Sequence, residues 1–191
     1  MTLPIITPLT PADLDDIMPL ERRAFKDPWT RQMYYVDLTE NFMATYLALR
    51  PDPQAVKAAC LPRILGWGGF WLMVDEAHIS TIAAHPDWRG CGLGQWLMVA
   101  LMQAALERGA VRSTLEVRVS NTPAMRLYEK LGYEVTGKRR RYYRDGEDGL
   151  IMTTPPLADA ALQARLAAAR TEAMTRAARC FEPTEARHEP E

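Results

Sequence analysis

The stretch WRGCGLGQWLM at 88–98 limits the possible folds more than any other part of the chain, because three glycines at alternate positions lead directly into an apolar helical pattern. Glycine weakens regular elements, but it lets the backbone adopt left-handed conformations and approach a ligand closely. At a helix start, the first amide N–H groups have no partner within the helix and lie at the positive end of its dipole. The stretch therefore predicts either a plain turn or an anion-binding loop before a long helix.

The surroundings of this loop favour a phosphate ligand. It lies between a predicted strand at 76–84 and a predicted helix at 92–109, and Arg89 adds a fixed cation at its start. A Walker A loop is excluded because no Gly-Lys-Ser/Thr follows. A dinucleotide-binding loop fits poorly, because the glycines do not have GxGxxG spacing and no acidic residue ends a strand about twenty positions later. The phosphate ligand that still fits is the pyrophosphate of a coenzyme A.

Hydrophobic periodicity and the Gly and Pro signals predict alternating elements along the rest of the chain. Thr10-Pro11 and Thr122-Pro123 each combine a helix cap with a proline at the first helical position, and Asp145-Gly146 suits a tight hairpin turn. The predicted helices cover 11–24, 30–37, 92–109 and 122–131, and the predicted strands cover 4–7, 44–50, 63–74, 76–84, 112–120, 133–143 and 149–154. This order predicts an α+β domain with a mixed sheet covered by helices.

Two segments do not fit this pattern. Residues 51–62 form a proline-bounded connection long enough to be an insertion. Residues 157–191 alternate Ala, Leu and Arg like a helix without a strong apolar stripe. We expect an appended helix there that could be mobile.

The composition indicates one soluble globular domain: the chain has 191 residues, of which 48% are hydrophobic. The formal net charge of -1 gives no electrostatic reason to expect a nucleic-acid or anionic-membrane partner. The run KRRR at 138–141 is interpreted as a solvated strand end rather than a nucleic-acid patch. No apolar run reaches the length of about eighteen residues that a membrane helix needs, and the N-terminus lacks a signal-peptide pattern. We expect a cytoplasmic protein.

The three cysteines, Cys60, Cys91 and Cys180, are widely separated and form no CxxC pair. This spacing predicts neither a disulfide framework nor a metal site. We expect ordinary reduced thiols and no metal cofactor.

Three motifs in the same order, RGCGLG, LEVRVSN and LYEKLGY, resemble those of the GCN5-related N-acetyltransferase (GNAT) family. The resemblance covers about residues 5–155, including ERRAFKDPWT and RRYYRDGEDGLIM. It is strongest to the bacterial branch that acetylates the N-terminal alanine of ribosomal protein S18, which is close to the N-terminal protein acetyltransferases. The resemblance implies the GNAT fold, a twisted mixed sheet of about seven strands with four helices around it, over 1–156. A C-terminal helical extension would occupy 157–191.

The resemblance also implies a binding site for acetyl-CoA, the co-substrate of the family. The pantetheine arm would pair like an extra strand with the backbone in the splay between two parallel strands, and the pyrophosphate would sit in the glycine-rich loop. The cofactor-binding residues that it implies are Ile82, Ala83, Ala84, Arg89, Gly90, Cys91, Gly92, Leu93, Gly94, Gln95 and Asn121. The family pattern has Asn and a bulkier β-branched residue where this chain has Thr81 and Ala84.

Glu116 and Tyr128 match the proton acceptor and the proton donor of the family. From the residues alone, Glu116 on the polar face of its strand is also compatible with a surface carboxylate facing Arg112 or Arg118. Tyr128 alone is also compatible with a half-buried aromatic of a helix. A terminal α-amine with a pKa of about 8 costs about 3.5 kcal/mol less to deprotonate at pH 7 than a lysine. A single carboxylate base therefore suits an α-amine.

Tyr142 and Tyr143 resemble the paired tyrosines that line the peptide groove of N-terminal acetyltransferases, and Trp29 could form the opposite wall. Packing of strand aromatics and of a core tryptophan explains the same residues without a substrate. Neither His78 nor His85 is assigned to catalysis. Two other functions stay open: acetylation of lysine or of a small-molecule amine, and a non-catalytic acyl-CoA-binding module.

Overall fold

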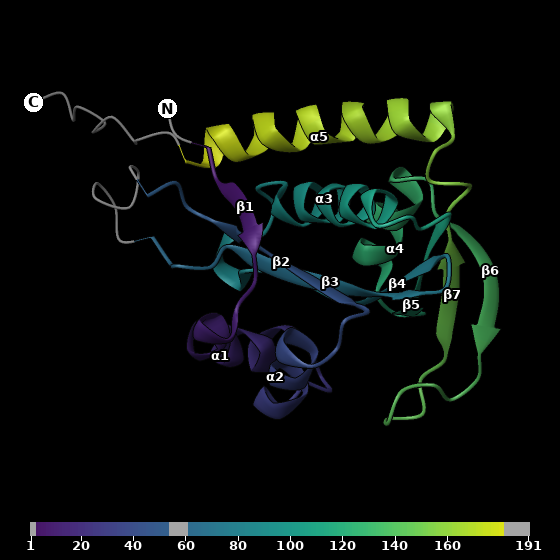
Figure 1. The fold of residues 1–191 in the computed structure, drawn as a ribbon, viewed down its shortest axis with the longest axis horizontal. Coiled ribbons are helices and arrows are strands. Elements are labelled where there is room, and N and C mark those ends of the chain that lie inside the picture. Colours follow the sequence, from purple (N-terminus) through teal and green to yellow (C-terminus); the bar gives the residue numbers. More distant parts are fainter. Residues whose placement is uncertain (1–2, 54–60, 182–191) are drawn as a thin grey trace, which may run out of the picture.

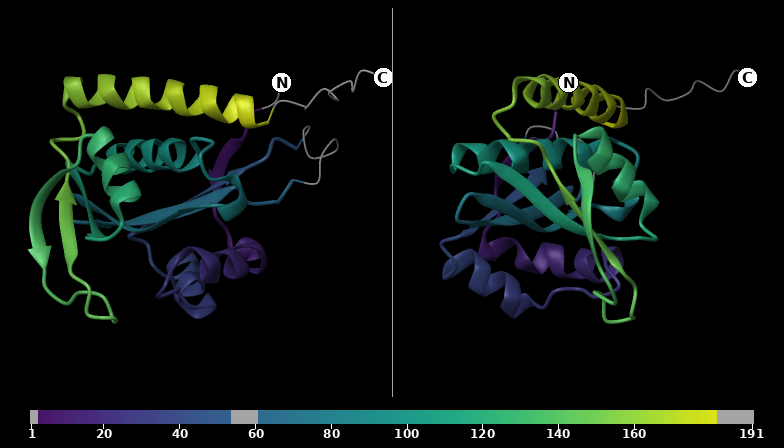
Figure 2. Two further views of the ribbon diagram at one scale, coloured as in Figure 1. Left: turned by 180° about the vertical axis from the view of Figure 1, so that it is seen from behind. Right: turned by 90° about the vertical axis from the view of Figure 1, so that its right-hand side faces the viewer.

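The computed structural model describes residues 3–53 and 61–181. One seven-stranded sheet has the order β1-β2-β3-β4-β5-β7-β6. Helices α1 and α2 cover one face of the sheet, α3 and α4 cover the other, and α5 lies outside α3 (Figures 1 and 2). The strands are β1 (Ile5–Pro8), β2 (Ala44–Arg50), β3 (Gly66–Met73), β4 (Glu76–Ala84), β5 (Arg112–Arg118), β6 (Glu134–Arg139) and β7 (Gly149–Thr153). The helices are α1 (Leu14–Ala24), α2 (Arg31–Thr39), α3 (Leu93–Glu107), α4 (Thr122–Lys130) and α5 (Ala160–Cys180).

The helix starts follow the caps expected from the sequence only in part: Thr30 is the N-cap of α2, but Asn121 and not Thr122 is the N-cap of α4. A short 3-10 turn over Pro11–Asp13 leads into α1, and the Asp13 carboxylate accepts hydrogen bonds from the Thr10 amide and hydroxyl, both at 2.8 Å. The Thr30 hydroxyl accepts from the Met33 amide at 3.2 Å to start α2. The Thr30 hydroxyl thus satisfies an amide that the first turn of a helix leaves without a partner, whereas Asp13 binds the residue that precedes the turn. The predicted α+β fold with a seven-stranded mixed sheet is confirmed.

The centre of the sheet opens where β4 and β5 run side by side. All neighbouring strands are antiparallel except this pair, and its pairing extends only from Glu76 opposite Arg112 to His78 opposite Thr114. β4 also bulges at Ser80, because Gly69 of β3 pairs with Thr81 while Phe70 pairs with Ile79. Bulges re-aim side chains and end regular pairing. The two strands therefore separate beyond His78, as the resemblance implied.

The C-terminal helix α5 is packed against α3. Its inward face is a stripe of small and branched side chains, all 4% exposed or less: Leu162, Leu166, Ala169, Ala173 and Ala177. All five belong to clusters that also contain α3 side chains. Alanine contributes little to an apolar pattern, but it allows two helices to approach closely, so the sequence pattern carries little sign of this packing. The mobility expected for the extension stays a prediction. The boundary between 1–156 and 157–191 stays a prediction.

The β6–β7 hairpin is shorter than the sequence predicts. β6 ends at Arg139 and β7 begins at Gly149, so Tyr142 and Tyr143 lie in the connecting loop and not in a strand. Beyond the end of β6, Arg141 has a left-handed φ of 50°, and its amide donates to the Asp148 carboxylate at 2.8 Å. The turn expected at Asp145-Gly146 forms at the tip of this loop, where Gly146 has a φ of 81°.

The expectation of reduced thiols is wrong for two of the three cysteines, because Cys91 and Cys180 form a disulfide across 89 residues of sequence. The spacing rule missed the pair because α5 folds back over the start of α3. Cys60 lies outside the described residues, as does most of the 51–62 insertion. Within residues 3–53 and 61–181, no helix is long and apolar enough to cross a bilayer, and no group of three or more His, Cys, Asp or Glu could hold a metal ion.

Candidate active site

The residues at 89–95, called the glycine loop below, turn the chain from β4 into α3. Gly90 and Gly92 have left-handed φ angles of 84° and 79°, which explains the glycines at these positions. The first helical bond of α3 runs from the Trp96 amide to the Gly92 carbonyl at 3.0 Å. The amides of the intervening residues therefore precede the helical ladder, at the positive end of α3. Arg89 is exposed beside them.

Not every residue of the glycine loop offers its side chain to a ligand. Leu93 and Cys91 are buried, and the Gln95 side chain, 5% exposed, donates to the Ala169 carbonyl at 2.6 Å. Its other end accepts from the Lys130 ammonium at 3.0 Å. Gln95 therefore joins α3 to α4 and α5 through its side chain, and only its main chain faces the loop.

A cleft of about 260 Å³ opens where β4 and β5 separate. Its wall combines residues of both strands with residues of the α1–α2 loop, α4 and the β6–β7 loop. The lining residues are Glu21, Phe25, Asp27, Trp29, Ile79, Ser80, Thr81, Ile82, Leu115, Glu116, Val117, Arg118, Asn121, Ala124, Tyr128 and Tyr143. The cleft thus brings together Glu116, Tyr128, Asn121 and Ile82, which the sequence singled out separately. Ala83 and Ala84 follow on β4 towards the glycine loop.

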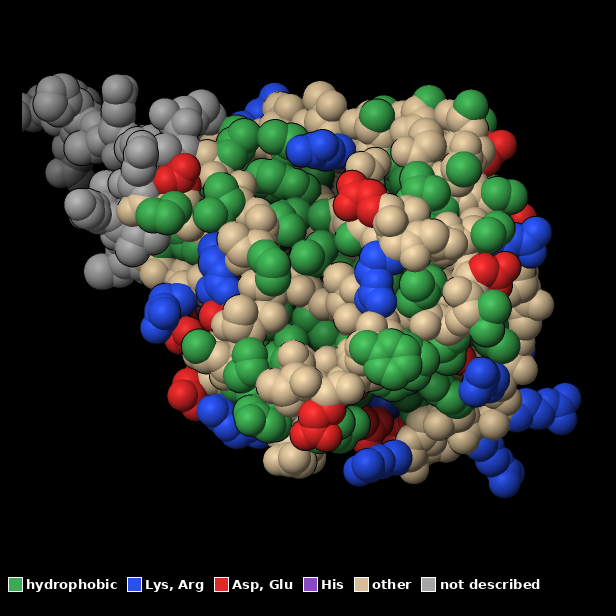
Figure 3. Space-filling model, in the orientation of Figure 1, with side chains coloured by type: hydrophobic (Ala, Val, Ile, Leu, Met, Phe, Trp, Pro, Cys, Tyr) green, Lys and Arg blue, Asp and Glu red, His purple; other side chains and the backbone are tan. Residues whose placement is uncertain are grey.

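A second, larger hollow of about 540 Å³ contains none of the predicted site residues. It lies between β1, β2, α3 and α5, on the face that Figure 3 shows, where hydrophobic side chains gather over β1 and α3. Glu107 and Arg170 are the charged residues among those that line it. The smaller cleft, and not the larger one, therefore contains Glu116 and Tyr128, the predicted acid–base pair.

Glu116 projects from β5 with a side chain that is only 6% exposed. One carboxylate oxygen lies 3.2 Å from Nε2 of His78, and the other lies 3.1 Å from Nε of Arg139. The alternative partners considered from the sequence, Arg112 and Arg118, are not those with which it pairs. The imidazole of His78 on β4 and the guanidinium of Arg139 on β6 thus each contact one oxygen of this carboxylate.

His78 was not assigned a role from the sequence. Its ring stacks on Trp71, with 6.1 Å between ring centroids and an interplanar angle of 20°. The parallel register of β4 and β5 would have revealed its contact with Glu116. His78 pairs with Thr114, and Thr114 precedes Glu116 by two residues, so both lie on the same face of β5.

Tyr128 lies in α4 and is 8% exposed. Burial raises the pKa of its phenol above the ordinary tyrosine value, and the neighbouring Tyr143 adds to the rise. The hydroxyl is therefore protonated throughout the neutral range and can donate a hydrogen bond into the cleft.

Asn121 is the N-cap of α4. Its side-chain oxygen accepts from the Ala124 amide at 3.3 Å, and the residue lines the cleft.

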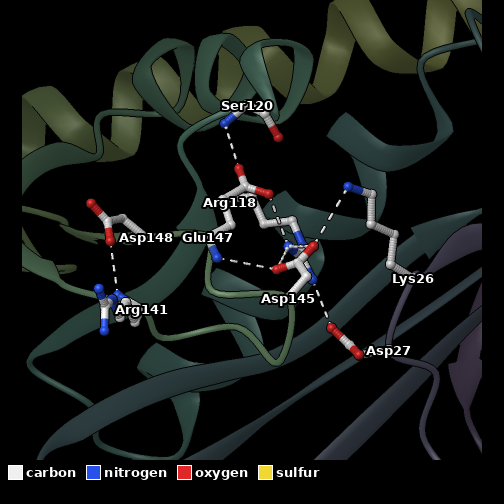
Figure 4. A network of polar contacts seen from close by, with 8 residues as sticks. All are labelled: Lys26, Asp27, Arg118, Ser120, Arg141, Asp145, Glu147 and Asp148. Carbon is white, nitrogen blue, oxygen red and sulfur yellow. Dashed lines mark hydrogen bonds and ion pairs between the residues drawn. The ribbon is translucent and has the colours of Figure 1, made fainter.

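Arg118 organises one side of the cleft (Figure 4). Its guanidinium, on a side chain 14% exposed, donates to Asp27 at 2.7 Å and to Asp145 and Glu147 at 2.9 Å each. The Tyr143 ring lies 3.8 Å from it. The hydrogen bond from Arg118 lowers the pKa of Asp145, so this carboxylate stays charged at neutral pH. One side chain of β5 thus ties the α1–α2 loop to the β6–β7 loop.

Three aromatic residues predicted to line a groove occupy different depths. Trp29 is half-buried and its ring centroid lies 5.3 Å from that of Tyr34. Trp29 and Tyr143 line the cleft. Tyr142 is 43% exposed, meets Tyr143 edge-on at 5.1 Å and lies outside the cleft lining.

Glu21 is a buried carboxylate that the sequence did not single out. It is 1% exposed and accepts hydrogen bonds from the Trp29 amide at 2.9 Å and the Tyr34 hydroxyl at 2.8 Å. Burial raises its pKa, and these two hydrogen bonds oppose the rise. Its contacts fix the position of Trp29 in the α1–α2 loop.

Comparison with known proteins identifies the family of the chain. A family model described as the Acetyltransferase (GNAT) family matches residues 14–133, which include the glycine loop and α4. A Bacillus subtilis (strain 168) protein provisionally named ribosomal protein bS18-alanine N-acetyltransferase is 40% identical over 141 residues, 73% of this chain and 87% of that protein. An N-alpha-acetyltransferase of Sulfurisphaera tokodaii is 34% identical over 149 residues, 75% of this chain and 87% of that protein.

A solved structure agrees as well. The crystal structure of the ribosomal-protein-S18-alanine N-acetyltransferase from Escherichia coli superposes with a TM-score of 0.70 at 30% identity, over 83% of this chain and 96% of that chain. Both the sequence matches and the architecture thus point the same way, and the chain belongs to the GNAT family of acetyltransferases.

Proposed function

We propose that this protein transfers the acetyl group of acetyl-CoA to the α-amine at the N-terminus of a protein, with the N-terminal alanine of ribosomal protein S18 as the expected acceptor. The observation that carries the proposal is that Glu116 and Tyr128 line one cleft, at the point where β4 and β5 separate. The relatives named above support the acceptor class, because their names specify alanine or α-amine acetylation. A ribosomal acceptor would require the cytoplasmic location expected from the sequence.

The donor would be held mainly by main-chain groups. The amides of the glycine loop and the positive end of α3 would bind the pyrophosphate, with Arg89 nearby. The pantetheine arm would lie along Ile82, Ala83 and Ala84 in the gap that β5 leaves open. A main-chain N–H of this segment would stabilise the oxyanion that develops on the thioester carbonyl.

The reaction would be a direct attack within the cleft. The neutral amine forms a bond to the thioester carbon, and its surplus proton leaves through water to Glu116, whose position His78 and Arg139 fix. The tetrahedral intermediate then collapses, the carbon–sulfur bond breaks, and the CoA thiolate departs.

Tyr128 would stabilise the departing sulfur with a hydrogen bond. Ordinary pKa values of about 10 for tyrosine and about 8.5 for a thiol make full proton transfer uphill by about 2 kcal/mol. Burial raises the pKa of Tyr128 further and enlarges this cost. A hydrogen bond needs no transfer, so it is the contribution that the environment of this phenol supports.

The deciding experiment offers three acceptors to the enzyme with acetyl-CoA and follows the mass of each. These are a peptide with the N-terminal sequence of S18, the same peptide with a blocked α-amine and an added lysine, and a polyamine. We expect an acetyl group on the first, lost in Glu116→Gln and reduced in Tyr128→Phe. Faster acetylation of the lysine peptide or the polyamine would assign the other acceptor class, and acetyl-CoA binding without transfer to any amine would indicate a non-catalytic module.

Arg118→Ala is expected to raise the KM for the acceptor peptide by about 10- to 100-fold while the Kd for acetyl-CoA stays unchanged. The substitution removes charge-assisted hydrogen bonds to both loops of the groove, each worth about 1.5–3 kcal/mol. Steady-state kinetics with varied peptide, together with calorimetry of acetyl-CoA, measure the two quantities.

Arg118→Lys should restore only part of the peptide affinity, because an ammonium cannot match the fork of the guanidinium. Arg126→Ala, on the exposed side of α4, serves as the matched control. An equal loss of acetyl-CoA and peptide binding in Arg118→Ala would refute a role confined to the acceptor groove.

A further inference from the structure

The helix α5, which lies beyond the family match at 14–133, rests directly on the glycine loop. A Cβ atom on Gly92 would come within 2.9 Å of the Ala173 carbonyl oxygen and 3.1 Å of its Cα. The Arg176 guanidinium donates to the Gly90 carbonyl at 2.6 Å. The backbone of α5 is thus in contact with the turn that starts α3.

Two further contacts extend this interface on either side. The Gln95 side chain donates to the Ala169 carbonyl of α5 at 2.6 Å. The Trp88 and Phe181 rings stack at 4.6 Å with an interplanar angle of 6°. The interface therefore follows the glycine loop from the residue before it to its last residue.

A covalent bond completes the interface. Cys91 lies between the two left-handed glycines of the loop and is 8% exposed, and its disulfide partner Cys180 is the exposed last residue of α5. The two bonded cysteines are 89 positions apart in the sequence. The disulfide therefore fixes the far end of α5 to the middle of the glycine loop.

We propose that the Cys91–Cys180 disulfide is a redox latch on the acyl-CoA site, which holds the glycine loop in its ligand-binding conformation so that reduction weakens acetyl-CoA binding. This inference rests on the proposed function only in taking the glycine loop as the pyrophosphate seat. Disulfides in the cytoplasm are mostly catalytic or redox-sensing, so the expected location agrees with a regulatory bond.

The physical reason is preorganisation. Glycine has many accessible conformations, so a free loop with Gly90 and Gly92 loses much conformational entropy when its amides become ordered around a ligand. The disulfide supplies that order before the ligand arrives. Without the disulfide, the loop still contacts α5 through the hydrogen bonds of Gln95 to Ala169 and of Arg176 to Gly90. Ligand binding therefore weakens but does not vanish.

Reduction would proceed by thiol–disulfide exchange from the solvent side. A thiolate of a dithiol reductant attacks the sulfur of Cys180, which is the more exposed of the two residues, the sulfur–sulfur bond breaks and Cys91 leaves as a thiolate that takes up a proton. The second thiol of the reductant then closes its own disulfide and releases Cys180. Two electrons pass to the protein and the dithiol is oxidised.

The test compares binding of S-ethyl-CoA to the oxidised and the dithiothreitol-reduced protein by calorimetry. This thioether is the probe because CoA itself carries a thiol that would exchange with the disulfide. We expect the reduced protein to bind at least about fivefold more weakly. Cys180→Ser should show the weakened Kd with or without dithiothreitol, while Cys60→Ser should bind like the parent protein and respond to the reductant.

A redox titration is the second measurement, and it needs no variant. Because coupling between two equilibria is reciprocal, saturating S-ethyl-CoA should shift the dithiothreitol ratio at half-reduction by the same factor as the change in Kd. It still decides the question if Cys180→Ser does not fold.

Two results would overturn the latch: three free thiols in the protein denatured without reductant, or equal Kd values in the oxidised and reduced states. If S-ethyl-CoA binds in neither state although the disulfide is present, the pyrophosphate seat is wrong, and the proposed function fails on its own account. Binding that is weaker in the reduced state, without acetyl transfer to any amine, would refute catalysis and leave the latch intact.

Discussion

Glu116→Gln is expected to lower kcat by about 10²- to 10⁴-fold while the Kd for acetyl-CoA stays unchanged. Glutamine keeps the size of the side chain and can still accept from Arg139, so the β5 strand and the cleft should keep their shape. It cannot take the proton that the attacking amine must lose. The expected loss corresponds to about 2.7–5.5 kcal/mol of transition-state stabilisation.

Single-turnover kinetics with the S18 peptide measure this loss, and circular dichroism checks the fold. Glu134→Gln is the matched control, because Glu134 is an exposed carboxylate on β6 of the same sheet. Loss of activity in both variants would point to a general effect of charge. A turnover of Glu116→Gln close to that of the parent would remove Glu116 from the proton path.

Gly92→Ala is expected to lower the free energy of unfolding by about 2–5 kcal/mol. Part of this cost is the left-handed φ of 79°, which is unfavourable for any residue with a Cβ atom. The rest arises because the added carbon would meet the backbone of Ala173, which can move away only if α5 shifts from α3. Urea unfolding followed by circular dichroism measures the change.

Gly90→Ala separates the two costs. Gly90 has nearly the same backbone conformation, with a φ of 84°, but no atom of the described residues lies within 4 Å of the added carbon. Its substitution should cost only about 1–2 kcal/mol, the conformational part. Equal destabilisation by the two substitutions would contradict the close packing of α5 on the loop.

The order of elements and the left-handed turns of the glycine loop could be predicted from the sequence because their signals are local. A capping side chain acts on an amide within one turn, as Thr30 does on that of Met33, and a left-handed turn favours glycine at the position itself. The alternation along 112–118 similarly placed Glu116 on the polar face of its strand. These patterns could be read without knowing the neighbours in space.

The partners of the predicted residues could not be predicted in this way. Arg139 of β6 and His78 of β4 hold Glu116, whereas the sequence offered Arg112 and Arg118, which are near it in the chain. Arg118 instead joins two loops that are far apart in sequence. Strand order in the sheet decides such contacts, and it is set by the packing of the whole domain.

By itself, the sequence determined the fold class and the family, because each depends on short patterns with their own conformational preferences. The residues that would face the cofactor and the acceptor stay predictions. Only the tertiary structure decided that α5 packs on α3, that Cys91 meets Cys180, and that the two tyrosines at 142–143 lie at different depths. An alanine stripe and two distant cysteines carry little signal along the chain. Their roles follow only from the folded chain, in which the two cysteines, 89 positions apart in the sequence, have a Cα–Cα distance of 5.9 Å.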